Sequence, residues 1–220
     1  DQSPLGPFIA LVPQLQGIQI GGTGTGRVEF GGNLAEKDAS GKTLFTTNNL
    51  TGSAQFSQLA LQIQDTPLVA TEPVVVRFNT RDIVFETARF SGGGSNVTIA
   101  GTKAITEDGV NNLSLDGRIN LSLLNAIPGV ASGDAFFAGI ADVSIRIAGV
   151  NKTARVSGTA ILENALFATF IGSDRLTFDR LQGRILFSAN QIQFDQATGY
   201  LGGGKFVASG GALIGDNLQL

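Results

Sequence analysis

The sequence predicts an all-β protein, a long curled antiparallel sheet with an open groove, built from two tandem repeats and carrying one or two short helices. Apolar and polar residues alternate in short runs such as Val74, Val76 and Phe78, which is typical of strands with one buried face. The 30 glycines and 15 phenylalanines, set among many Thr, Ser and Asn residues, favour strands and tight turns. Turn signals such as the three glycines at 92–94 separate the runs at hairpin spacing.

Composition excludes several classes of function. Hydrophobic residues make up 42% of the 220 residues and charged residues 15%, so the chain should fold. The net charge is −3 and the cations are scattered singly, which argues against a nucleic-acid partner. Histidine and cysteine are absent, which excludes Ser-His-Asp and Cys-His catalysis and the usual zinc sites. We therefore expect no enzyme, no catalytic residue, no metal and no cofactor.

The alternating runs define the expected strands in chain order. In the first half their apolar members are Val28 and Phe30; Leu59, Leu61 and Ile63; Val74, Val76 and Phe78; Ile83 and Phe85; Val97 and Ile99. In the second half they are Val143, Ile145 and Ile147; Ala160 and Leu162; Leu176 and Phe178; Ile185 and Phe187; Ile192 and Phe194. Nothing helical is long enough for parallel crossovers, so we expect an antiparallel meander.

Two short helices are expected, at 8–12 before Pro13 and at 123–127 before Pro128, the second capped by Ser122. No apolar run approaches the length of about 18 to 20 residues that a membrane-spanning helix needs. The chain has no initiator methionine or signal peptide, and we expect it to be a segment of a longer mature protein.

An internal repeat divides the chain into units of 1–112 and 113–220. The run Leu50-Thr-Gly52-Ser-Ala54-Gln-Phe56 matches Val156-Ser-Gly158-Thr-Ala160-Ile-Leu162. Five further residues recur 109 positions later: Phe78, Ile83, Phe85, Ala88 and Gly101 match Phe187, Ile192, Phe194, Ala197 and Gly210. The glycines at 92–94 are matched with those at 202–204, and a loop at 31–47 is expected only in the first unit.

A continuous sheet of about fourteen strands at about 4.8 Å each would extend about 65 Å, so it should curl. One reading of its apolar face is the dry core of a sandwich. The repeat favours an open groove for acyl chains instead. The predicted groove residues are Val28, Phe30, Leu61, Ile63, Val76, Phe78, Ile83, Phe85, Phe90, Ile99, Val143, Ile145, Ile147, Leu162, Phe167, Leu176, Phe178, Ile185, Phe187, Ile192, Phe194 and Phe206.

Glycine-rich and acidic stretches do not form recognisable catalytic or cofactor motifs. The glycines at 21–26 lack the dinucleotide-binding spacing and lead into a strand. Gly41-Lys42-Thr43 ends like a phosphate-binding loop, but Glu36 stands where that loop needs glycine. Carboxylate pairs such as Asp174 with Asp179, or Asp82 with Glu86, have no sequence feature that would bring them together in a cleft.

The second unit resembles the TamB and AsmA-like family. The residues that carry the resemblance are Val156-Ser-Gly158-Thr-Ala160, Leu176-Thr-Phe178-Asp-Arg-Leu181-Gln-Gly183-Arg-Ile185-Leu-Phe187, and Ile192-Gln-Phe194-Asp-Gln-Ala197 followed by Leu201-Gly-Gly-Gly204-Lys-Phe206. The first unit departs from the pattern at Ser91 and at the 31–47 insertion.

The resemblance implies a β-taco sheet with an apolar interior, in an inner-membrane-anchored protein that crosses the periplasm of a two-membrane bacterium. It implies phospholipid transport or outer-membrane protein assembly, with an outer-membrane barrel of the TamA type as partner. The alternative is a surface β-solenoid or adhesin-like structural protein, also long, Gly- and Thr-rich and free of cysteine.

Overall fold

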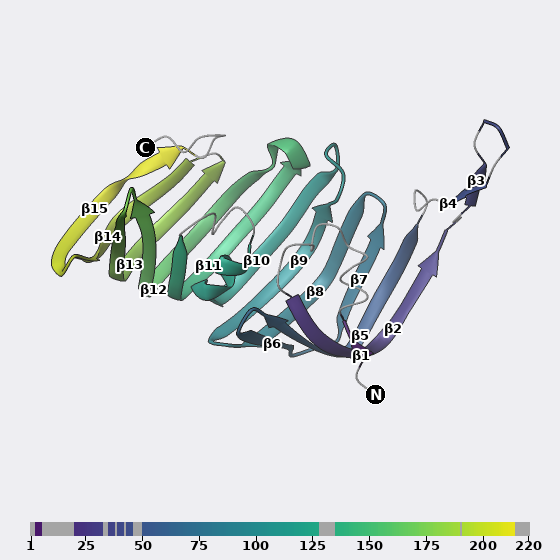
Figure 1. Ribbon diagram of the computed structural model, residues 1–220, viewed down its shortest axis with the longest axis horizontal. Helices are drawn as coiled ribbons and strands as arrows, with labels where there is room; N and C mark the ends of the chain where they lie inside the picture. The colour runs from purple at the N-terminus through teal and green to yellow at the C-terminus, as the bar shows by residue number, and fades with distance from the viewer. Residues whose placement is uncertain are drawn as a thin grey trace.

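The computed structural model describes residues 3–5, 20–32, 35–37, 39–41, 43–45, 50–127, 135–189 and 191–213. These residues form one 13-stranded sheet in which every strand pairing is antiparallel, and a separate two-stranded sheet (Figure 1). The prediction of a curled all-β fold is confirmed. None of the described helices is long and apolar enough to cross a membrane.

The strands follow the chain in order. They are β1 (Ser3–Pro4), β2 (Ile20–Gly31), β3 (Ala35–Lys37), β4 (Thr43–Phe45), β5 (Thr51–Ile63), β6 (Thr66–Ala70), β7 (Val74–Asn79), β8 (Asp82–Gly92), β9 (Ser95–Ala104), β10 (Val110–Asn120), β11 (Phe136–Val150), β12 (Arg155–Ile171), β13 (Asp174–Ala189), β14 (Gln191–Leu201) and β15 (Gly204–Leu213). Two 3₁₀ helices, η2 (Leu121–Ala126) and η3 (Asn151–Thr153), complete the described elements.

The large sheet is a meander in which sequence neighbours pair. Its order is β1-β2-β5-β6-β8-β9-β10-β11-β12-β13-β14-β15, and β7 pairs with β5 and β8 beyond the end of β6. Strands β6 and β7 thus share one position between β5 and β8, interrupted at Pro73, whose ring nitrogen has no N–H for the ladder. Strand β13 occupies the matching position in the second half without a break.

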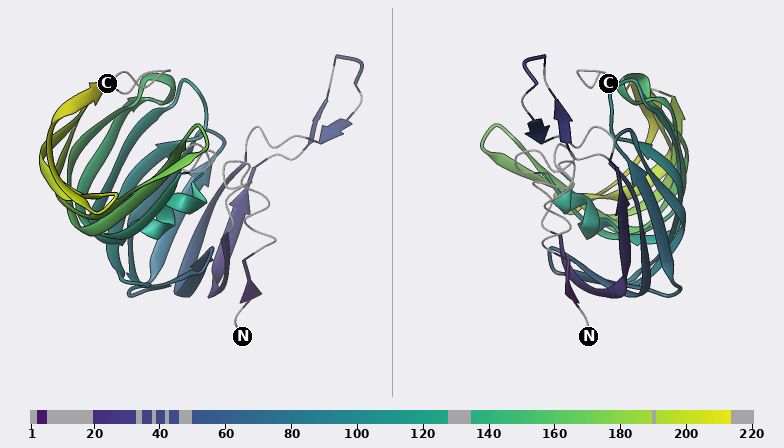
Figure 2. Two further views of the ribbon diagram at one scale, coloured as in Figure 1. Left: turned by 60° about the vertical axis from the view of Figure 1, so that its left-hand side comes forward. Right: turned by 90° about the vertical axis from the view of Figure 1, so that its right-hand side faces the viewer.

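The sheet curls into an open C, with β1 as its first strand beside β2 and with η2 on its inner side (Figure 2). Glycines with positive φ permit close strand approach within it, as at Gly158 (φ +128°), where a Cβ would overlap the Ser144 carbonyl oxygen. Bulges also bend the strands, and each places one extra residue on one strand. They occur between Phe85 and Ala88 and between Phe194 and Ala197.

Pairings in the first half recur in the second half. Gly52 pairs with Phe78 as Gly158 pairs with Phe187, and Phe85 pairs with Gly101 as Phe194 pairs with Gly210. The predicted boundary at 112/113 falls inside β10, and the sheet continues through it.

The glycine turns of the two halves also correspond, but one position away from the predicted alignment. Gly93 and Gly94 have φ of 54° and 82°, and Gly202 and Gly203 have φ of 58° and 85°. Each pair forms the two-residue turn of a hairpin, and positive φ at both central positions is what a type I′ turn requires. The matching residues are therefore 93–94 and 202–203, rather than 92–94 and 202–204.

The helix expected at 123–127 begins earlier and is a 3₁₀ helix, η2, over Leu121–Ala126. Its cap is Asn120, whose side chain accepts a hydrogen bond from the Ser122 N–H, so the assignment of Ser122 as the cap was wrong. The helix expected at 8–12 lies outside the described residues. Within the 31–47 insertion, β3 and β4 pair with each other and not with the large sheet.

Candidate functional site

Strand register places every predicted groove residue on one side of the sheet. Residues that are directly opposite each other in an antiparallel pair point to the same side. Phe30 lies opposite Gly52, Gly52 opposite Phe78, and Phe78 opposite Ile83. The same tracing extends to β15 and assigns all the predicted residues to one side. We call this side the concave face, because η2 packs on it inside the curve of the sheet (Figure 2).

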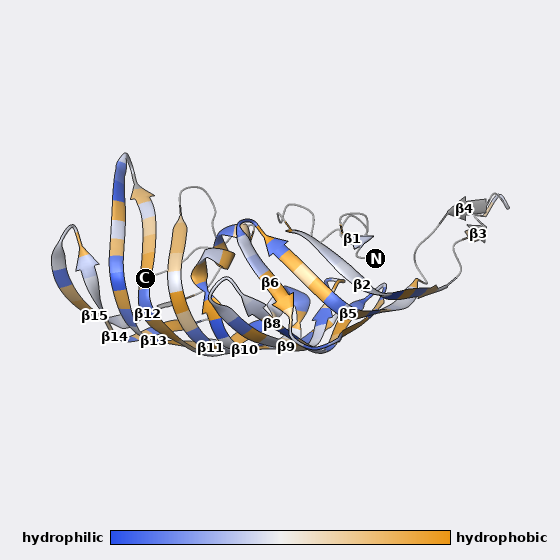
Figure 3. Ribbon diagram, turned by 90° about the horizontal axis from the view of Figure 1, so that it is seen from below, coloured by the Kyte–Doolittle hydropathy of each residue, from blue (hydrophilic) through white to orange (hydrophobic). Residues whose placement is uncertain are grey.

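Bulges preserve this arrangement where simple alternation would break it. Phe85 and Ala88 are three residues apart, and so are Phe194 and Ala197, yet the register places all four on the concave face. Each bulge absorbs the odd residue. Seen edge-on, the strands show alternating hydrophobic and hydrophilic bands along the curve (Figure 3).

Accessibility distinguishes this face from a dry core. Among the predicted residues only Phe90 is buried, at 6% exposure. Phe30 is 54% and Phe194 36% exposed, and the others are half-buried. The inner faces of a sandwich would bury such side chains against a second sheet. Over the described residues, the concave face instead leaves a large apolar surface partly open to solvent.

Small elements cover part of the concave face. Leu5, next to β1, packs with Leu59 of β5 in a cluster that also includes Leu123 of η2. On the other side of the helix, Leu121 packs with Ala141 in a second cluster. Thus η2 contacts both clusters and lies between the first-half and second-half portions of the face.

Phenylalanines form a row across the second half of the concave face. The ring of Phe167 lies 5.2 Å from that of Phe137 and 6.0 Å from that of Phe178, measured between centroids. Phe178 contacts Phe206 in an edge-on arrangement at 5.9 Å. Gly199 belongs to β14, which lies between β13 and β15. Because it has no side chain, it leaves room for the Phe206 ring. Aromatic pairs at these separations attract each other beyond simple burial.

The sequence prediction missed several members of the concave face. Phe137 follows Phe136 directly, so alternation alone could not decide which ring points inward. Two leucines of β10 were also omitted, although Leu113 and Leu115 alternate with polar residues and could have been found by the same signal.

One cation stands on the concave face, where its apolar surface ends. Lys103 of β9 is the Cα partner of Ile83, and its Nζ donates to Asn151 Oδ1 at 2.7 Å, to the Ala104 carbonyl at 3.1 Å and to Asn111 Oδ1 at 3.2 Å. Desolvation by burial lowers the pKa of Lys103. Asn111 is itself fully buried and also accepts the Ala104 N–H. Sequence patterning gave no reason to single out these residues.

The opposite, convex face carries most of the charge. Arg118 pairs with Glu163 and with Asp142, and Arg77 pairs with Glu86, all on exposed strand surface. Such surface pairs contribute little stability, on the order of 0–1 kcal/mol each. The convex face also has exposed apolar residues, including Ile161, Phe170 and Val207.

The carboxylates considered for acid–base chemistry do not converge. Glu86 is engaged by Arg77, and Asp179 accepts from Arg180 on the convex side, while Asp174 is exposed at the start of β13. Over the described ranges, no group of three or more acidic residues is placed to hold a metal ion. The glycines at 21–26 lie inside β2, as expected for a strand and not for a phosphate loop.

Comparisons with known proteins give no match. Neither protein-family models nor curated sequences match the chain, and no solved structure matches its fold.

Proposed function

We propose that this chain is a non-enzymatic lipid-binding module whose concave face holds phospholipid acyl chains. The observation that carries the proposal is the partial exposure of an almost wholly apolar face along a curled sheet of 13 strands. Contiguous exposed apolar patches on proteins mark interaction surfaces or ligand-binding grooves. Acyl chains suit it because each methylene removed from water stabilises the complex by about 0.8 kcal/mol.

The resemblance to TamB and AsmA-like proteins gives the proposal a cellular setting. In that setting the chain is a segment of a larger periplasmic protein anchored in the inner membrane. It passes lipids between the two membranes, or supports outer-membrane protein assembly, together with an outer-membrane barrel of the TamA type. The Leu201 and Phe206 positions of the family pattern both lie on the concave face, in keeping with a lipid-contacting role.

The adhesin-like alternative fits the strand pairing less well. A β-solenoid stacks short rungs and encloses its apolar residues. Here long strands of up to 17 residues pair antiparallel as a meander, and the apolar face stays partly open. Both features support a lipid-binding role over a purely structural one.

A charge on the concave face tests the proposal. Phe194→Arg replaces an exposed ring of the concave face, where the long side chain can keep its guanidinium hydrated in the free protein. A bound acyl chain would desolvate that charge at a cost on the order of several kcal/mol. We expect Phe194→Arg to weaken binding of a fluorescent phospholipid to the purified chain at least tenfold, with an unchanged circular dichroism spectrum.

The matched control is Gln193→Arg, the same substitution one residue away. Gln193 lies opposite Leu186 on the convex face and is exposed, so the new charge stays in water. Lipid binding by Gln193→Arg should equal that of the wild type. If both folded variants bind as the wild type does, acyl chains do not contact this face and the proposal is wrong.

A further inference from the structure

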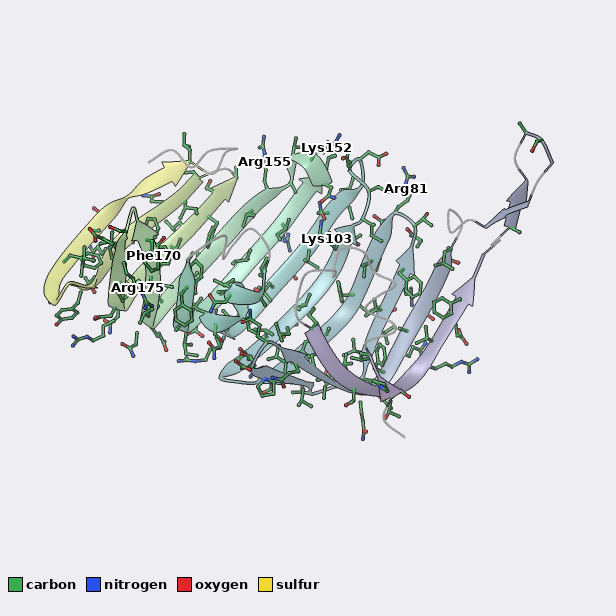
Figure 4. All side chains as sticks on the ribbon, viewed as in Figure 1. Arg81, Lys103, Lys152, Arg155, Phe170 and Arg175 are labelled. Atoms are coloured by element: carbon green, nitrogen blue, oxygen red, sulfur yellow. The ribbon has the colours of Figure 1, made fainter. Side chains whose placement is uncertain are left out.

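The position of Lys103 is unusual for a charged residue. Apart from Asp174 at the start of β13, Lys103 is the one charged residue that strand register assigns to the concave face among the described strands. It follows Val97, Ile99 and Gly101 on the inward side of β9. Its ammonium therefore stands where the apolar surface meets one edge of the sheet, the edge along which Arg81 and Lys152 also lie (Figure 4).

The charge of Lys103 has no carboxylate counterion among the described residues. Its three hydrogen bonds go to neutral oxygens, those of Asn151, Ala104 and Asn111. The two nearby acidic residues of the β9–β10 loop are engaged by other cations: Asp108 with Arg81 at 3.4 Å, and Glu107 with Lys152. A half-buried ammonium held only by neutral groups retains most of its attraction for an anion.

Desolvation supports the same conclusion. Burial lowers the pKa of Lys103, which means that the surroundings disfavour its charged form without a compensating anion. An anion that arrives at this position would remove that penalty. An anionic oxygen adds an attraction between opposite charges that a neutral amide oxygen lacks, so exchange of one amide partner for the anion is favourable.

We propose that Lys103 binds the anionic headgroup of the lipid whose acyl chains lie on the concave face. This inference rests on the proposed function and adds a preference for lipids that carry a phosphate or carboxylate group. The headgroup would lie at the edge of the sheet beside Asn151, while the acyl chains extend over Ile99 and its neighbours. Asn111 anchors the site from below, because its Oδ1 holds both the Lys103 ammonium and the Ala104 N–H.

Short-chain lipids below their micellar concentration test this site on the purified chain. Dioctanoyl phosphatidic acid and dioctanoylglycerol differ only in the phosphate, and decanoate supplies a carboxylate instead. We expect the wild type to bind phosphatidic acid at least fivefold more tightly than dioctanoylglycerol, as measured by calorimetry. If decanoate binds as tightly as dioctanoyl phosphatidic acid, a carboxylate serves this site as well as a phosphate.

Variants at Lys103 assign the preference to one residue. Lys103→Gln should remove the preference for phosphatidic acid and leave dioctanoylglycerol binding unchanged, whereas Lys103→Arg should retain the preference. Lys103→Met, which keeps the apolar stem, provides a second neutral variant if Lys103→Gln does not fold. Lys152→Gln is the matched control, since Lys152 is an exposed cation on the same edge that is already paired with Glu107.

The outcomes separate the two proposals. A wild-type chain that binds none of the three lipids would overturn the proposed function itself. Equal binding of phosphatidic acid and dioctanoylglycerol by the wild type would reject the headgroup site alone. Survival of the preference in folded Lys103→Gln or Lys103→Met would likewise reject Lys103 as the anion-binding residue.

Discussion

Gly158 illustrates how single residues set the curvature of the sheet. Its φ of +128° is unfavourable for residues with a side chain, and a Cβ there would overlap the Ser144 carbonyl oxygen on the neighbouring strand. At Gly101 and Gly117 a Cβ would likewise overlap a backbone oxygen of an adjacent strand. These glycines all face the concave side, where inward bending brings backbones together.

We therefore expect Gly158→Ala to lower the free energy of unfolding by about 2 kcal/mol or more, because it adds backbone strain to a steric overlap. Gly204→Ala is the control, since Gly204 has no positive φ and its nearest neighbour is the Leu201 carbonyl oxygen at 3.5 Å. That change should stay within about 0.5 kcal/mol. Urea titration measures both values, and equal stability of the two variants would contradict this account of the curvature.

At the scale of elements, η2 depends on one residue that connects it to the sheet. The Asn120 side chain accepts the Ser122 N–H at 3.0 Å and donates to the Gly93 carbonyl at 2.7 Å, while its backbone N–H donates to Ser95 Oγ. Asn120 thus caps the helix and ties it to the β8–β9 turn. The position of η2 matters because its leucines belong to both hydrophobic clusters.

Loss of this cap should loosen the helix from the concave face. We expect Asn120→Ala to cost about 1–2 kcal/mol of stability, the usual effect of removing a capping side chain together with a tertiary hydrogen bond. Asn112→Ala, an exposed position on the convex side of the same strand, should have little effect. Thermal unfolding compares the two, and an unchanged melting temperature for Asn120→Ala would show that packing alone holds η2.

Across the whole molecule, buried contacts are distributed unevenly along the sheet. The larger hydrophobic cluster joins β5–β9 with Leu5 and η2, and the smaller one joins η2, β11 and β12. Strand β15, by contrast, has no buried residue among those whose exposure is described, and it pairs only with β14. Local stability should therefore fall from the middle of the sheet toward β15.

Amide hydrogen exchange measures this gradient directly. We expect amides of β8–β11 to exchange most slowly and those of β15 to exchange fastest among the long strands, because opening β15 breaks one ladder and exposes little apolar area. Uniform protection across the sheet would mean that it unfolds as a single cooperative unit. Lipid bound to the concave face should slow exchange in β13–β15 most, where the face has least cover.

The sequence by itself determined most of the long strands, though not β10, and the side of the sheet to which most of their residues belong. Strand periodicity is local: residues two apart point the same way wherever the strand lies, so Val143, Ile145 and Ile147 could be assigned together before any pairing was known. Local chemistry also indicated the hairpin turns at the paired glycines. It located η2 only approximately, because helix ends depend on cap geometry, and Asn120 rather than Ser122 supplies the cap.

Only the tertiary structure decided the features that depend on contacts between strands. The alternation of apolar and polar residues does not reveal a bulge. That Phe194 and Ala197 lie on the same side of the sheet therefore follows only from their pairing with β13 and β15. Alternation cannot choose between Phe136 and Phe137 either, a choice made by pairing with β12. Lys103 and Asn151 are far apart in the chain and meet because β9, β10 and β11 lie side by side. The partial exposure of the described side chains on the apolar face was likewise decided by packing, because the exposure of a side chain depends on what the rest of the chain brings against it.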